Sequence, residues 1–168
     1  MSALNRMVGA AGAADRPGPV DEDRWTDGHA RWELYCRAAG QPEAAELLLA
    51  AVRAETDLPL SSSVVVMMLE KVPAEGRRRW VDALRPENRG FAERRSDELA
   101  VLDSLDREDR SFDAGDVEAW SDWLQLRAAQ GETGGDGHVL DLLAEHGRTK
   151  RIRRHAAESA AGRRARER

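Results

Sequence analysis

The stretch from Gln41 to Val72 constrains the fold most, because it holds the densest run of aliphatic side chains in a chain that is otherwise rich in charge. Its first half predicts a helix, since Pro42 suits a first helical position and apolar residues follow at helical spacing. The expected buried stripe consists of Ala44, Leu48, Ala51 and Val52, widened by Ala45 and Leu49. This segment supplies a core and carries no catalytic motif.

The second half of the stretch is ambiguous between helix and strand. Asp57-Leu58-Pro59 interrupts the first helix, and Ser61 to Ser63 offer N-caps to the apolar run Val64 to Leu69. Three valines in a row favour a strand, whereas the serines, the methionines and Glu70 favour a helix. No second strand is evident to pair with it, and a lone strand would leave its backbone groups unsatisfied. We therefore expect a helix.

The rest of the chain also predicts helices, at residues 23–39, 73–84, 86 to about 105, 116–130, 138–146 and 149 to about 166. In the first of these, Trp25, Trp32 and Cys36 are expected on one face, with His29 and Tyr35 beside them. The helix from Pro73 is expected to bury Trp80, Val81 and Leu84. The long helix from Pro86 is expected to bury a face formed by Phe91, Leu99, Leu102 and Leu105. The predicted fold class is all-α, with seven or eight helices arranged as stacked αα-hairpins or as an irregular bundle.

Charge divides the chain into three parts. Residues 1–23 are rich in Ala, Gly and Pro without periodicity, and we expect a disordered leader. Residues 24–147 carry 15 basic and 25 acidic side chains, which predicts an acidic helical domain. Residues 148–168 carry nine basic and two acidic side chains, which predicts a basic C-terminal helix or tail.

Composition indicates a soluble cytoplasmic protein. The single cysteine, Cys36, allows no intramolecular disulfide, and no signal peptide is recognisable. The longest apolar run, Val64 to Leu69, falls far below the roughly 20 residues that a bilayer requires, so no membrane partner is expected. Only Lys71 and Lys150 among 26 basic residues are lysines, a bias typical of high-GC coding, and we expect a bacterial protein.

Two hairpins resemble helical-repeat proteins. In W-E-L-Y-C-R-A-A-G-Q-P-E-A-A-E-L-L-L-A-A-V the spacing is similar to the small and large apolar positions of a tetratricopeptide hairpin, at Gly40, Ala45, Leu49 and Val52, with the downstream proline displaced to Pro59. The segment V-L-D-L-L-A-E-H-G-R-T-K-R-I-R-R-H-A-A-E-S-A resembles the second helix of a HEAT repeat, at Ile152-Arg153 and Ala156-Ala157. The two do not match each other and no internal period appears. The resemblance implies stacked helical pairs and a protein-binding surface.

Catalytic and metal-binding patterns are not evident. No histidine has the spacing of a helical zinc site, and with one cysteine a structural zinc site is close to excluded. Cys36 fits a buried structural cysteine better than a nucleophile. The acidic run 103–118 does not keep the register of a calcium-binding EF-hand loop, and G-E-T-G-G-D-G lacks the lysine of a phosphate-binding loop. We expect no metal, no cofactor and no enzymatic activity.

The leading hypothesis is therefore a non-enzymatic helical protein–protein interaction module, regulatory or accessory in role. Most of the five tryptophans are expected in the core. Trp120 and Trp123, three residues apart, project close together and are the candidate partner-binding residues. A groove between helical hairpins is the other place where a protein partner could bind. The oligomeric state is left open.

The alternative hypothesis is a nucleic-acid-associated protein that uses its arginine-rich C-terminal helix. The candidate phosphate contacts are Arg148, Lys150, Arg151, Arg153 and Arg154. The acidic body would repel a duplex, and the segment has no aromatic residue on which a base could stack. Docking of this helix on the acidic body is the simpler interpretation. A helix-turn-helix within residues 58–72 would have a poor, apolar recognition helix.

Overall fold

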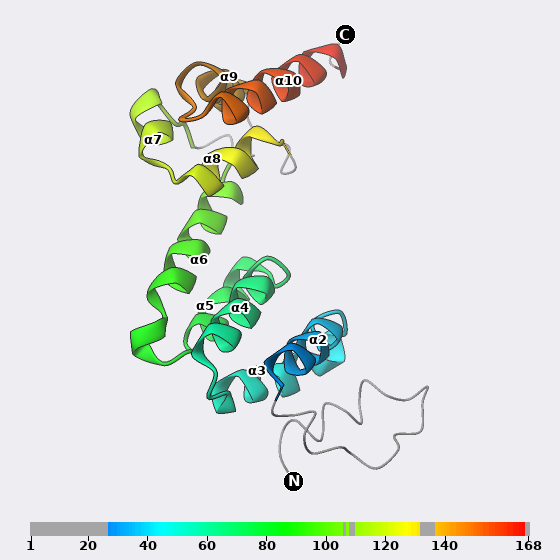
Figure 1. Cartoon of the computed structure of the whole chain (residues 1–168). Coiled ribbons are helices and arrows are strands. Elements are labelled where there is room, and N and C mark those ends of the chain that lie inside the picture. The colour runs from blue at the N-terminus through cyan, green and yellow to red at the C-terminus, as the bar shows by residue number, and fades with distance from the viewer. Residues whose placement is uncertain (1–26, 106, 108–109, 132–136, 167–168) are drawn as a thin grey trace. The chain divides into compact units, whose positions relative to one another are not determined.

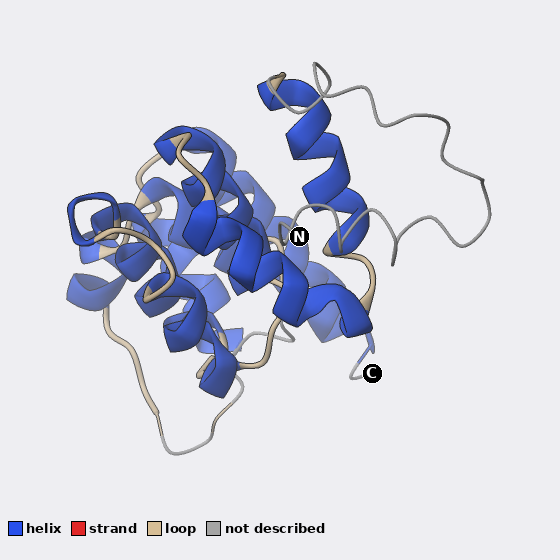
Figure 2. Ribbon diagram, turned by 90° about the horizontal axis from the view of Figure 1, so that it is seen from below, coloured by secondary structure: helices blue, strands red, loops and turns tan. Residues whose placement is uncertain are grey.

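The structure is a computed structural model, and it describes residues 27–105, 107, 110–131 and 137–166 (Figure 1). The described residues contain helices and no strand, which confirms the all-α prediction (Figure 2). They divide into two compact units, unit 1 up to Ser96 and unit 2 from Asp97, so the division falls within one helix and not at the change of charge near residue 148. The predicted leader, residues 1–23, lies outside the described residues. None of the described helices is both long and apolar enough to cross a membrane.

The first described helix of unit 1, α2 (Gly28–Ala38), buries only part of the expected face. Asp27 caps it by accepting a hydrogen bond from the backbone N–H of His29. The buried residues are Leu34, Tyr35 and Ala38, whereas Trp32 and Cys36 are only half-buried. Trp32 and Cys36 are thus less buried than expected, and Trp25 lies outside the described residues. The helix turns Tyr35 inward instead, where its hydroxyl donates to Glu55.

The next hairpin confirms the sequence prediction. The 3₁₀ turn η2 (Pro42–Ala44) leads into α3 (Ala45–Ala54). The buried stripe consists of Ala44, Leu48, Leu49, Ala51 and Val52, all among the residues expected there. Pro42 occupies the first turn, where its missing N–H costs no hydrogen bond.

The ambiguous segment is a helix, α4 (Leu58–Leu69), as expected. It begins earlier than predicted, because Asp57 and not a serine is its N-cap, accepting from the N–H of Leu60 at 3.0 Å. The expected break between the two helices is present, since α3 ends at Ala54, and Pro59 lies in the first turn of α4. At the other end Arg77 donates from Nε to the carbonyl of Leu69 at 3.1 Å, which satisfies a C-terminal carbonyl.

Helix α5 (Ala74–Val81) precedes the turn η3 (Pro86–Asn88) and the long helix α6 (Gly90–Leu102). As expected, α5 and the turn after it bury Trp80, Val81 and Leu84. The prediction for Phe91 is wrong, because this side chain is 52 % exposed. The buried positions of α6 are Ala92, Arg95, Leu99 and Leu102. Phe91 lies in the first turn of α6 and about 20° from Leu102 around the helix, so its helical position alone does not account for its exposure.

In unit 2 the predicted single helix over 116–130 is two helices, α7 (Ala114–Ala119) and α8 (Asp122–Ala129). The chain turns at Trp120, whose backbone is extended. Ser121 then caps α8 by accepting from the N–H of Leu124. The buried Gln125 side chain donates to the carbonyl of Val117 at 2.7 Å, so a carbonyl freed by the break finds a partner.

The last two helices, α9 (Gly137–His146) and α10 (Lys150–Arg166), form a hairpin where two helices were predicted. Helix α10 packs on α9 and α8. Its buried residues are small or short: Ile152, Ala156 and Ala160. The turn places buried Gly147 against Ile152, so close that a Cβ at Gly147 would meet Ile152 Cγ2 at 2.8 Å. Small residues at this contact allow the helices to approach closely.

Candidate functional site: an apolar groove on unit 1

Helix α4 differs from the other described helices in carrying no charged residue on any face. It packs against α2, α3 and α5. Its buried residues are Leu60, Ser61, Val64, Val65, Met68 and Leu69. Ser62, Val66 and Met67 remain half-buried on the other side. A helix without a charged face is normally covered on most of its sides, so the open side of α4 is unusual among the described helices.

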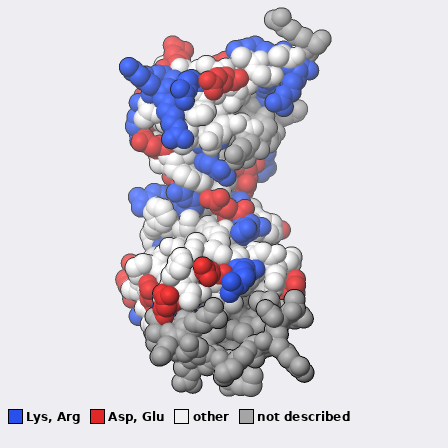
Figure 3. All heavy atoms as spheres, turned by 45° about the vertical axis from the view of Figure 1, so that its right-hand side comes forward, with Lys and Arg blue, Asp and Glu red and all other residues white. Residues whose placement is uncertain are grey.

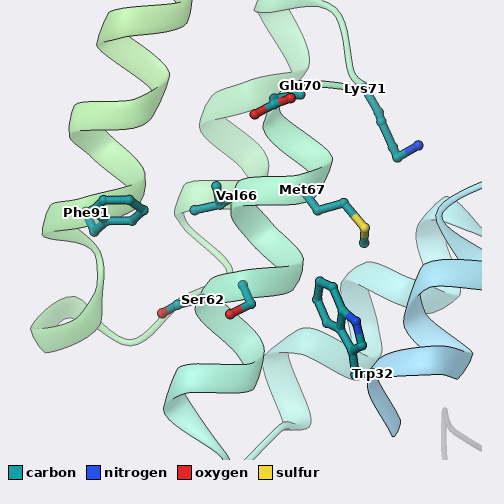
Figure 4. Close-up of a pocket in the computed structure, with 8 residues that line it drawn as sticks. Trp32, Ser62, Val66, Met67, Glu70, Lys71 and Phe91 are labelled. Atoms are coloured by element: carbon teal, nitrogen blue, oxygen red, sulfur yellow. The ribbon is translucent and has the colours of Figure 1, made fainter. Parts of the chain in front are cut away.

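Two aromatic side chains border the open side of α4. Figure 4 shows Trp32 of α2 and Phe91 of α6 on opposite sides of it, with Val66 on the side of Phe91 and Met67 on the side of Trp32. The hollow between them, here called the α4 groove, has a volume of about 580 Å³. Its lining consists of Trp32, Ser62, Ser63, Val66, Met67, Glu70, Lys71 and Phe91. A second hollow of about 330 Å³ shares Trp32 and Ser63 and continues toward Gly28 and Asp57.

The Phe91 side of the groove is fixed by a hydrogen-bonded side chain. Asn88 donates from Nδ2 to the carbonyl of Leu58 at 2.9 Å and to Ser62 Oγ at 2.5 Å. These bonds attach the turn η3 to α4. Because α6 begins two residues after Asn88, they also fix where Phe91 emerges. The exposed aromatic ring is thus held beside the groove by a defined connection.

The Trp32 side of the groove is fixed by a buried polar network. Glu55, whose side chain is 5 % exposed, accepts from Tyr35 OH at 2.8 Å and from Arg31 Nε at 3.2 Å. It also accepts from the backbone N–H groups of Thr56 and Asp57, each at 3.0 Å. Burial and the Glu55 carboxylate hold the pKa of Tyr35 far above its ordinary value. This network anchors α2, the helix that carries Trp32, to the loop before α4.

The groove floor is less polar than its serines suggest. The Ser63 hydroxyl donates to the carbonyl of Pro59 one turn earlier at 2.9 Å. Ser62 Oγ accepts the Asn88 bond. Beyond them, Met67 Sδ lies 4.0 Å from Cys36 Sγ, so two polarizable sulfur atoms meet at the α2 edge of the groove. The floor therefore presents mainly hydrocarbon and sulfur to a ligand.

The two predicted partner-binding residues do not form a shared exposed face. Trp120 is 8 % exposed and packs edge to face on Phe112, with ring centroids 5.3 Å apart. Trp123 is half-buried, and the guanidinium of Arg127 lies 5.8 Å from the centroid of its ring. The turn at Trp120 sends these two residues into different elements, so their spacing of three no longer places them on one helix.

The predicted phosphate contacts divide into two groups. The Arg148 side chain already has partners in unit 2. It pairs with Asp122 at 2.8 Å and donates from Nη2 to the carbonyl of Trp120 at 2.8 Å. Arg153 donates to the carbonyl of Gly147. The other three side chains, those of Lys150, Arg151 and Arg154, are exposed.

No metal site emerges from the part of the chain that the structure describes, where no three His, Cys, Asp or Glu side chains are grouped to hold an ion. Asp113 and Asp116 of the acidic run instead form a capping box at the start of α7. Each carboxylate accepts from the backbone N–H of the other residue, at 2.9 and 3.0 Å. These two carboxylates therefore stabilise the start of α7.

Comparisons of this chain with protein-family models, with curated proteins and with solved structures find no match. The helical-repeat resemblance of the two hairpins therefore stays a prediction.

Sequence reasoning placed the groove residues in the core. Trp32 and Phe91 were assigned to buried faces, and Val66 and Met67 to the apolar segment around which the core was expected. One signal could have identified them: the twelve residues of α4 contain no charge, although a helix of a small domain is expected to turn one charged face to water. A helix with no such face requires cover on all sides.

Proposed function

We propose that this protein is a non-enzymatic interaction module whose α4 groove binds an amphipathic helix of a partner protein. The observation that supports the proposal is the open face of α4, uncharged and bordered by Trp32 and Phe91. Phe91 is the one large hydrophobic side chain classed as exposed among the described residues, and it lies at this groove. Exposed aromatic and apolar groups gathered at a groove are typical of interaction sites.

A helix fits the groove better than an extended peptide. The floor is itself a helix face, which from Ser62 to Glu70 spans roughly 12 Å, about two turns. Its walls also come from helices, so a partner helix would pack by the same side-chain interdigitation that holds unit 1 together. Recognition by strand addition requires a sheet edge, and the described part of the chain has no strand. The flexible Met67 side chain adapts to the shape of an apolar anchor.

The energy available is that of burying a few large side chains. Fully covering a side chain such as Phe91 contributes roughly 1.5–3 kcal/mol. Replacing Phe91 with alanine should therefore weaken partner binding by about tenfold or more, since about 1.4 kcal/mol corresponds to a factor of ten. Phe91 is 52 % exposed, so its removal costs the free protein little.

Selection from a library of random peptides tests the proposal without a known partner. Peptides of roughly 16 residues, about four turns of helix, are displayed and selected on the full-length chain. They are then screened on Met67→Glu, which places a charge in the groove, and on Ala74→Glu, which adds the same charge at an exposed position of α5 outside it. Circular dichroism confirms that both variants fold.

The proposal expects selected peptides with apolar residues at i, i+3 or i+4 and i+7 that become helical when bound. They should lose binding to Met67→Glu and keep it with Ala74→Glu. Peptides that bind both variants equally, or a selection that yields no binder, would contradict it.

Nucleic-acid binding through α10 is the second candidate, favoured by the cluster of exposed cations that Lys150, Arg151 and Arg154 form at its start. Figure 3 shows further Lys and Arg side chains gathered at the other end of this helix. The cluster is smaller than the sequence suggested, because Arg148 and Arg153 bond to backbone carbonyls.

If this candidate is correct, the chain binds DNA or RNA with an affinity that falls steeply with salt. The triple variant Lys150→Glu/Arg151→Glu/Arg154→Glu should then abolish binding, while Met67→Glu should not affect it.

A further inference from the structure

We infer that the helix bound in the α4 groove is acidic: carboxylates flanking its apolar stripe meet Arg94 on one side of the groove and Lys71 at its end. This inference rests on the proposed function and adds the charge of the partner. Both cations are exposed, and Lys71 lines the groove itself.

Arg94 is placed at the groove by the Phe91 ring. It lies one turn after Phe91 on α6, and its guanidinium carbon is 5.9 Å from the ring centroid. The guanidinium of Arg95 lies 5.5 Å from the same ring. Attraction between a cation and the aromatic face holds the Arg94 side chain beside the groove, while its N–H groups remain able to donate to a planar carboxylate. The aromatic anchor and the cation are thus presented together.

Neither Lys71 nor Arg94 forms an ion pair within the described residues. Some cations of unit 1 do have a carboxylate close by: Arg79 pairs with Glu46, and Arg78 pairs with Asp82 at 3.0 Å. The whole chain carries 31 acidic and 26 basic residues, so carboxylates are not scarce. Lys71 and Arg94, two cations at the same groove without a carboxylate partner among the described residues, would both form ion pairs with an acidic ligand.

The carboxylates near the groove do not cancel this pattern. Glu70 is the acidic residue of the lining, and it interacts with another group of the protein. On α2, Glu33 is exposed and lies 3.4 Å from His29. A partner residue one position from an apolar anchor lies about 100° around its helix, on the flank of the apolar stripe, where it would reach Arg94 when the anchor packs on Phe91.

The expected effect is one of selectivity. Exposed ion pairs contribute little each, so two of them should favour an acidic over a basic helix by about tenfold at low salt. Such contacts also depend on ionic strength, and the preference should shrink as salt is added. The apolar contacts, in contrast, should survive high salt.

Three synthetic peptides with one apolar Leu/Phe stripe test this inference, their flanking positions filled with Glu, with Gln or with Lys. Their affinities for the full-length protein are measured by calorimetry at low and at high salt. The charge-swapped variant is Lys71→Glu/Arg94→Glu. Its matched control is Arg53→Glu/Arg85→Glu, which makes the same change in net charge at exposed positions outside the groove lining. Met67→Glu reports whether binding occurs in the groove.

The inference expects the Glu peptide to bind about tenfold more tightly than the Lys peptide, with the order reversed in Lys71→Glu/Arg94→Glu and kept in the control. Three peptides that bind equally, and lose binding to Met67→Glu, would overturn the inference and leave the proposed function standing. No binding, or binding unaffected by Met67→Glu, would overturn the proposed function and the inference with it. Self-association of the chain that Met67→Glu abolishes would identify the occupant as a second copy, and would also overturn the inference.

Discussion

Tyr35 is the only tyrosine of the chain, and its hydroxyl donates to the buried Glu55 carboxylate. Burial, and then the hydrogen bond to Glu55, raise the pKa of Tyr35 in the folded protein, whereas the unfolded chain ionises near pH 10. The stabilisation is therefore complete below about pH 10. It is lost as the pH rises further, at up to about 1.4 kcal/mol per pH unit.

The ultraviolet absorbance of phenolate follows this single group directly. We expect no phenolate in the folded protein at about pH 10, and half-ionised phenolate in the chain unfolded by denaturant at that pH. Tyr35→Phe should remove the corresponding loss of stability above pH 10. A folded protein that forms phenolate with the midpoint of the unfolded chain would show that Tyr35 does not anchor α2 as described.

For Trp32 the sequence predicts the neighbours on its helix face but not how deeply that face is buried. Its helical spacing with Cys36 indicates a shared face correctly, since both are half-buried. The spacing does not say which face of α2 turns inward. The inward face carries Leu34, Tyr35 and Ala38, and the bond of Tyr35 to Glu55, 20 positions away, is a contact that leaves no periodic signal.

At the scale of elements, the turn between α9 and α10 forms hydrogen bonds with residues at the turn between α7 and α8 and with α8. Gln125, fully buried, donates to Val117 and accepts from the backbone N–H of Arg148 at 2.8 Å. The Arg148 side chain returns to the carbonyl of Trp120 and to Asp122. Arg148, a phosphate contact in the sequence prediction, therefore joins two turns of unit 2.

We predict that Arg148→Ala lowers the free energy of unfolding by about 1–2 kcal/mol, because carbonyls of the α7–α8 turn lose a charged donor. Arg151→Ala, at an exposed position three residues on, should change it by less than about 0.5 kcal/mol. Denaturant titration of the two variants measures the difference. Equal effects at both positions would contradict the structural role of Arg148.

The helices that the sequence predicted well are those whose order is local. The stripe of α3 repeats at helical spacing and begins at a proline, so both its face and its start were predictable. The break at Trp120 was not, because the bonds that stabilise it come from Gln125 and from Arg148 across the chain. The exposure of Phe91 was not predictable from periodicity, because Phe91 lies about 20° from the buried Leu102 around α6.

At the scale of the whole molecule, the chain forms two compact units, so damage to one core should leave the other intact. Gly147→Ala provides the test, because its Cβ would clash with Leu143 O and would meet Ile152 Cγ2 at 2.8 Å. We expect a loss of about 1–3 kcal/mol in unit 2 from this overpacking. Gly162→Ala is the matched control: it lies within α10 with nothing inside 4 Å, and should stabilise by about 0.5–1 kcal/mol.

Hydrogen exchange resolves the two units in that experiment. Gly147→Ala should reduce the protection of α8, α9 and α10, while the protection of α3 and α4 stays unchanged. Equal loss of protection in both units would mean that they unfold as one body.

The groove could be predicted only in part, because the open face of α4 depends on how the whole of unit 1 packs. The uncharged sequence of α4 indicated a helix that needs cover on every side. Which side α2, α3 and α5 leave open, and that Trp32 and Phe91 border it, follows from the tertiary packing. A pattern read along one segment contains no information on that arrangement.

Partner binding in the α4 groove is tested most directly by the indole N–H signals of the five tryptophans, recorded by NMR while the Glu-flanked peptide is added. Trp32 lines the groove, Trp80 lies in the core of unit 1, and Trp120 and Trp123 belong to unit 2. We predict that the Trp32 signal shifts progressively to saturation, while those of Trp80, Trp120 and Trp123 stay in place. A saturating shift of Trp123 with Trp32 unchanged would move the binding site to unit 2 and contradict the account.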